Sequence, residues 1–189
     1  PSVFLAEFIR FYRIIDFKFP DKTKIPPKAY APRPEHCLQF FSTPQHLGYD
    51  QNRKIVVARQ SMLVGQHSVT NTRSFFDDLL SFQIIFQPGA LYRIADIPVS
   101  EFTNRVIEPA DVFGKSVDEF CERLFQERSY SRMLMVAETF LMKRLCNLKK
   151  DAHPLDELVK RMITGYNGTL DSFIHDACLS HRQFDRKFL

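Results

Sequence analysis

A short polar segment between residues 180 and 189 carries side chains suited to recognising a partner. The run Ser180-x-x-Gln183 has the form of a capping box, in which the two side chains satisfy the first backbone N–H groups of a helix. Arg182, Asp185 and Arg186 follow at a spacing that places them on one face of that helix. Arginine can donate two hydrogen bonds to guanine, and aspartate can accept one from the amino group of cytosine. The segment therefore has the chemistry needed to contact base edges in a DNA groove.

The rest of the same helix has other predicted roles. Phe184 and Phe188 lie four residues apart and form its expected inward face. His181 and Gln183 are expected near phosphates. Arg186 has a second interpretation, as a structural partner of Asp185 or of the preceding helix. On spacing alone, an ordinary helical hairpin with solvated polar side chains is the more common interpretation.

Two more helices are predicted before this segment. The first begins behind Pro154 and ends before Gly165. The second is capped by Thr169. Its expected apolar face consists of Leu170, Phe173, Ile174 and Ala177. Because little chain separates it from the helix at Ser180, the pair forms a tight helix-turn-helix.

The segment resembles the first helix-turn-helix of the AraC/XylS family of transcription regulators. The matching residues are Asn167-Gly168-Thr169-Leu170, Phe173-Ile174, Leu179-Ser180 and Phe184-x-Arg186-x-Phe188. Two positions depart from the family pattern, because Ile174 replaces its alanine and Cys178 replaces its glycine. The resemblance places Cys178 in a left-handed turn, where a cysteine is mildly strained.

Upstream motifs resemble the cupin-like sensor domains that precede such modules. They lie at residues 8–12, 33–41, 64–65, 86–90, 97–105 and 111–114. The resemblance implies an α+β fold with three parts: a cupin-like sensor β-barrel over residues 1–114, a two-helix connector and dimerisation segment over 115–152, and the first helix-turn-helix of a truncated DNA-binding domain over 153–189. The family carries two helix-turn-helix units, so we expect the chain to be a piece of a longer protein.

Hydrophobic periodicity is consistent with this order. Short apolar runs separated by turn residues, among them 54–58, 61–65 and 79–86, are typical of strands, and prolines predict a loop over 21–33. Apolar residues then recur with helical spacing over 116–128 and 131–147. Their broad stripes either cover the barrel or form a dimer seam, and we expect a mixture of the two.

The charge distribution counts against DNA binding. Residues 1–60 contain ten Lys/Arg and five Asp/Glu, whereas residues 153–189 contain five of each. Duplex binding usually requires several Lys/Arg side chains on phosphates. We expect a second helix-turn-helix to carry part of the missing positive charge.

Other classes of protein fit the sequence poorly. His36, His46 and His67 are solitary, without the HxH pair of metal-binding cupins, and we assign no metal and no cofactor. The sequence lacks a Gly-x-Ser-x-Gly elbow, a P-loop and a GxGxxG motif, and we assign no catalytic residue and expect no enzyme. Four scattered cysteines indicate a reduced, cytoplasmic protein. No apolar run is long enough to cross a membrane.

The sequence therefore predicts a transcription regulator that senses a small-molecule effector and binds double-stranded promoter DNA as a homodimer. The effector and the residues that bind it are not identifiable from the sequence. The alternative is a ligand-binding or dimerisation module with a cupin-like barrel that does not bind DNA.

Overall fold

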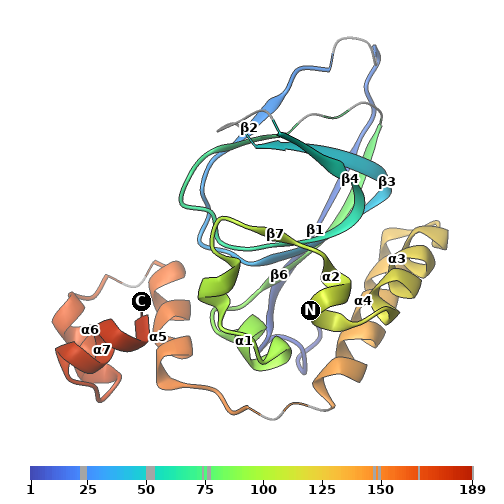
Figure 1. Ribbon diagram of the computed structural model, residues 1–189. Helices are drawn as coiled ribbons and strands as arrows, with labels where there is room; N and C mark the ends of the chain where they lie inside the picture. The colour runs from blue at the N-terminus through green and yellow to red at the C-terminus, as the bar shows by residue number, and fades with distance from the viewer. Residues whose placement is uncertain are drawn as a thin grey trace.

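The computed structural model describes residues 1–21, 25–49, 54–73, 75, 78–146, 148, 150–165 and 167–188, with the backbone alone at 46–49, 54–58, 71–72 and 187–188. An antiparallel sheet is followed by helices along the chain (Figure 1). The predicted α+β class is confirmed. Within the described ranges, no helix combines the length and the apolar character that a bilayer span requires.

The sheet contains seven described strands and curls around an interior (Figure 1). They are β1 (Ile9–Phe17), β2 (Lys28–Tyr30), β3 (Cys37–Tyr49), β4 (Lys54–Val64), β5 (Asn71–Arg73), β6 (Leu79–Phe86) and β7 (Val106–Ile107). The main order is β1-β6-β3-β4-β7, and β5 pairs with both β2 and β3. Pro44 lies inside β3, where the register with β4 shifts between Phe40 and Gln45. A register shift accommodates a residue that cannot donate to the ladder.

Side-chain alternation gives the sheet two different faces. The outer face is apolar, and Leu38, Phe40 and Phe82 are fully buried there. The inner face combines apolar side chains with buried polar ones such as Gln39 and Gln83. The outer face therefore builds the main core, whereas the inner face surrounds polar groups.

Helices α3 (Ser116–Gln126) and α4 (Tyr130–Leu145) cover the outer face. The Phe120 ring packs edge-on against Phe40, with centroids 4.9 Å apart, and stacks on Phe140 at 4.3 Å. The apolar stripes predicted over 116–128 and 131–147 thus serve largely to bury the sheet. The expected dimer seam stays a prediction.

Several short elements differ from the sequence-based expectation. The predicted loop over 21–33 contains β2, because pairing with β5 stabilises a strand that is weak by itself. The runs at 54–58 and 61–65 belong largely to one strand, β4. Three short helices were not predicted: α1 (Ala90–Ala95), the 3₁₀ helix η2 (Val99–Phe102) and α2 (Pro109–Phe113). Each is too short to establish a helical period.

The last three helices are α5 (Pro154–Ile163), α6 (Leu170–Asp176) and α7 (His181–Phe188), and they lie on the other side of the molecule from α3 and α4 (Figure 1). The segment between α4 and α5 contacts α1 through Lys150. Arg93 donates from Nε to the carbonyl of Lys150 at 3.2 Å, and the Lys150 ammonium pairs with Asp96. This ammonium also lies 3.7 Å from the centre of the Tyr92 ring. The sheet and the terminal helices are therefore joined through α1.

Candidate nucleic-acid interface and internal cavity

Helices α5, α6 and α7 share a small apolar core of their own. Its buried members are Leu155, Leu158, Phe173, Ile174, Ala177 and Phe184. Leu170 was predicted to lie on the apolar face of α6. This is wrong, because its side chain is 53% exposed at the first position of the helix. The side chain of Phe188 lies outside the described residues, so Phe184 is the described anchor of α7, at 4% exposure.

The turn between α6 and α7 has the geometry of a helix C-cap. Cys178 has a φ of 53°, and its N–H donates to the carbonyl of His175 at 2.9 Å. The N–H of Leu179 donates to the carbonyl of Ile174 at 3.2 Å, which is the six-to-one bond of a Schellman motif. The left-handed conformation predicted for Cys178 is confirmed.

We expect Cys178→Gly to stabilise the protein by about 0.5–1 kcal/mol, because glycine adopts positive φ without the steric cost of a Cβ. Urea denaturation followed by circular dichroism would measure the difference. Cys146→Gly is a suitable comparison, because Cys146 is also exposed but ends α4 with a φ of −57°. A stabilisation of the same size there would argue against relief of strain at residue 178.

The start of α7 is fixed by the predicted capping box. The N–H of Gln183 donates to Ser180 Oγ at 3.3 Å, and Gln183 Oε1 accepts from the Ser180 N–H at 3.0 Å. The same oxygen accepts from the Ser180 hydroxyl at 3.1 Å. Gln183 therefore holds the helix start, and its amide NH₂ group is the part that remains for a phosphate contact.

Arg182, Asp185 and Arg186 are all exposed on α7. Their spacing of three and four residues places them on one face, and the buried Phe184 occupies the opposite face. Within the described part of the chain, these three side chains form no hydrogen bond or ion pair with one another or with α6. The structure thus brings them together as an outward polar stripe.

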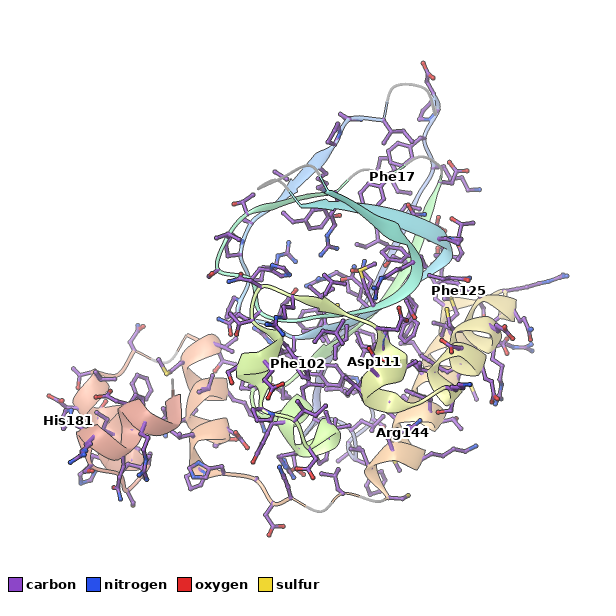
Figure 2. The ribbon with its side chains drawn as sticks, in the orientation of Figure 1. Phe17, Phe102, Asp111, Phe125, Arg144 and His181 are labelled. Atoms are coloured by element: carbon purple, nitrogen blue, oxygen red, sulfur yellow. The ribbon has the colours of Figure 1, made fainter. Side chains whose placement is uncertain are left out.

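His181 lies at the outer end of the terminal helices (Figure 2). Its Nε2 is 3.4 Å from Asp171 Oδ1 of α6, and both side chains are largely exposed. An ion pair of this kind requires a protonated imidazole and contributes little in water. A more enclosed pair joins Arg161 of α5 to Asp176 of α6 at 3.0 Å. Arg161 therefore serves to hold the helices together.

A second candidate site lies inside the curled sheet. A cavity of about 370 Å³ is lined by residues of β1 to β6 and by the loops between them. At its wall, Arg13 donates two hydrogen bonds to Glu35, at 3.2 and 3.3 Å, and one to Gln83 at 2.8 Å. Cross-strand pairing produces this arrangement, because Arg13 is opposite Gln83 and Gln83 is opposite Gln39.

Arg73 lies deeper in this cavity and is only 8% exposed. It donates from Nη1 to Gln39 Oε1 at 3.0 Å, and its guanidinium lies 4.2 Å from the centre of the Tyr30 ring. Burial lowers the pKa of the nearby His67, and the Arg73 charge lowers it further. Burial also raises the pKa of the Cys37 thiol to about 12, so the thiol stays protonated. The wall therefore holds the buried Arg73 guanidinium close to a protonated thiol.

No residue of this cavity was assigned from the sequence. The available signal was a polar residue at the centre of an otherwise apolar strand, as in Gln39 within Cys37–Phe41 and Gln83 within Leu79–Phe86. Among the described residues, no three His, Cys, Asp or Glu side chains are grouped so as to hold a metal ion.

The fold and sites define an α+β protein in which a curled antiparallel sheet encloses a polar cavity and a helix-turn-helix follows. A family model described as a domain of unknown function, DUF6597, matches residues 1–108, and the chain belongs to this family. No curated protein matches the sequence. A structure of apo ToxT from Vibrio cholerae, carrying a lysine-to-alanine substitution, is similar with a TM-score of 0.49 and 8% identity, over 94% of this chain and 73% of that one. Likeness at this level leaves function to be argued from the sites.

Proposed function

We propose that this protein is an AraC-type transcription regulator, in which the sheet domain over residues 1–114 binds a small effector and the helices over 153–189 contact promoter DNA. The observation that carries the proposal is the polar stripe of α7, where Arg182, Asp185 and Arg186 face outward on a helix anchored by Phe184. The sequence resemblance to the AraC/XylS family supports the same conclusion.

The arrangement suggests how an effector changes DNA binding. The cavity adjoins β6 through Gln83, and β6 leads into Gly89 and α1. Helix α1 holds the connecting chain through Arg93 and Lys150. An effector that binds one arrangement of these elements more tightly shifts the population toward it, and α5 to α7 are repositioned with α1.

We expect Arg186→Ala to weaken binding to a preferred duplex by about 1–3 kcal/mol, because a bidentate contact to guanine contributes this much. The preferred sequence would first be selected from a random duplex library with the unaltered chain. Fluorescence anisotropy at fixed salt concentration would then compare the two proteins.

Arg123→Gln is the matched control, since Arg123 is exposed on α3, away from α7. It should change the affinity by far less than Arg186→Ala. Equal affinities of the unaltered protein and the Arg186→Ala variant for the duplex would show that Arg186 does not contact the DNA. Failure to select any duplex would favour a ligand-binding module that does not bind DNA.

The proposal includes a homodimer formed through α4. Met135 and Met142 lie seven residues apart on this helix and are 69% and 39% exposed. The buried side of α4 already covers the sheet, so these side chains are available to a second copy. Sedimentation velocity at micromolar concentration should show a dimer that Met135→Lys dissociates; a strict monomer would contradict this part.

A further inference from the structure

The three terminal helices rest on the sheet domain through polar contacts. Among the described residues, the apolar core of α5 to α7 has no member in common with the apolar clusters of the sheet and of α1 to α4. Domains joined without a large apolar interface usually move relative to each other unless specific contacts hold them. The polar contacts between α1, α5 and the segment before α5 therefore decide how the terminal helices are placed.

Asp156 makes the contact between α5 and the start of α1. A Cβ built at Gly89 would lie 2.0 Å from Asp156 Oδ1, so the carboxylate sits directly against the glycine backbone. Its other oxygen, Oδ2, accepts a hydrogen bond from the His153 N–H at 3.0 Å, as part of the capping box that begins α5. The carboxylate cannot turn away from Gly89 without loss of this bond. The side chain that fixes the start of α5 therefore also holds α5 against α1.

Arg93 of α1 holds the segment before α5 and is itself held by residues near the N-terminus. Its Nε donates to the Lys150 carbonyl at 3.2 Å, and its Nη1 donates to Glu7 Oε1 at 2.6 Å. The guanidinium also lies 4.5 Å from the centre of the Phe8 ring. The segment runs past α1 before it enters α5 (Figure 1). Arg93 and Asp156 thus attach the terminal helices to one short helix at two points.

The placement of α5 sets the direction of the polar stripe on α7, because α5, α6 and α7 share one apolar core. In a homodimer, two such stripes reach two half-sites of a duplex only if their separation matches the spacing of the half-sites. Loosely tethered helices would reach half-sites at many spacings, whereas docked helices reach them at few.

We propose that Asp156 is a positioning residue that docks the DNA-contacting helices on Gly89, and that this docking makes the protein selective for one spacing of paired half-sites. The docking is independent of DNA. The selectivity for spacing rests on the proposed function, including its homodimer.

Double electron–electron resonance on the full chain, without DNA, measures the docking. Cys146 ends α4 and Cys178 lies between α6 and α7, and both are exposed, so nitroxide labels on them report the distance between the two parts. Burial raises the pKa of the Cys37 and Cys121 thiols to about 12, so these thiols stay protonated and unlabelled. The unaltered protein should give one narrow distance distribution. A broad distribution would overturn the docking.

Gly89→Ala should broaden the distribution and shift its centre, because the added Cβ displaces Asp156. Gly114→Ala is the matched control. Gly114 has a φ of +72°, close to the +74° of Gly89, but no atom of the described residues beyond its chain neighbours would lie within 4 Å of an added Cβ. This variant should keep the narrow distribution. An unchanged distribution in Gly89→Ala, or the same broadening in Gly114→Ala, would overturn the role of the contact.

Two variants of Asp156 replace this comparison if Gly89→Ala does not fold. In Asp156→Asn, the amide oxygen can still accept from the His153 N–H while the side chain rests on Gly89, so the distribution should stay narrow. Asp156→Ala removes both contacts and should broaden it. Equal distributions from the two variants would overturn the assignment to Asp156.

Fluorescence anisotropy tests the selectivity for spacing. A selected duplex with two half-sites is compared with one that has about five more base pairs between them, half a helical turn. The unaltered protein should prefer the selected spacing by at least about tenfold, because only one half-site is reached in the other duplex. Asp156→Ala should reduce the preference to less than about threefold, and Asp156→Asn should keep it.

An unchanged preference in Asp156→Ala would overturn the role of the docking in spacing. Failure to select any duplex would overturn this role together with the proposed function. The docking itself is judged by the resonance measurement alone, so the two proposals fail separately.

Discussion

Phe184→Ala is expected to unfold α7 and abolish binding to every duplex while leaving the sheet intact. The ring is 4% exposed and belongs to a core with six buried members among the described residues. Removal of a buried phenyl ring costs about 3–5 kcal/mol, and so small a core has little stability to lose. Amide hydrogen exchange should show loss of protection over α6 and α7, with protection retained in β3 and β6.

Leu170→Ala is the matched control for this experiment. Leu170 is also a large apolar residue of the same three helices, but its side chain is 53% exposed. Its replacement should change stability by no more than about 0.5 kcal/mol, as is usual for surface positions. Protection of α7 that persists in Phe184→Ala would mean that the ring does not anchor the helix, and the outward orientation of Arg186 would lose its support.

The helix-turn-helix could be predicted because its determinants are local. The caps at Thr169 and Ser180 depend on residues three positions further along, and the structure shows both caps. The backbone strain at Cys178 arises from the positive φ of this one residue in the turn between α6 and α7. Leu170 was assigned incorrectly because helical spacing places it on the apolar side, whereas the first turn of α6 extends beyond the core.

The cavity could not be predicted, because its residues come from distant parts of the sequence. Arg13 and Gln83 are 70 positions apart and meet only through the register of β1 and β6. That register depends on which faces are buried, and this is known only once α3 and α4 cover the outer face. The dependence on long-range pairing also explains β2, a three-residue strand stabilised by β5.

Gly65→Ala is expected to destabilise the sheet domain by about 3 kcal/mol, at the upper end of the usual range for overpacking a buried site. A Cβ at this position would lie 1.8 Å from the carbonyl oxygen of Phe102 and 2.5 Å from its carbon. The obstacle is backbone, which cannot rotate away as a side chain does. It is also held by two hydrogen bonds, from the Gly65 N–H to Arg105 at 3.1 Å and from the Asn104 N–H to Gln66 at 2.9 Å.

Gly165→Ala separates this steric effect from the conformational cost of replacing glycine. Gly165 has a φ of +89°, and no atom of the described residues beyond its chain neighbours would lie within 4 Å of an added Cβ. Its replacement should therefore cost about 1 kcal/mol through backbone strain alone. Urea denaturation of both variants gives the comparison. If the two substitutions cost the same, the backbone around Phe102 moves aside easily, and steric overlap with it does not explain the cost at Gly65.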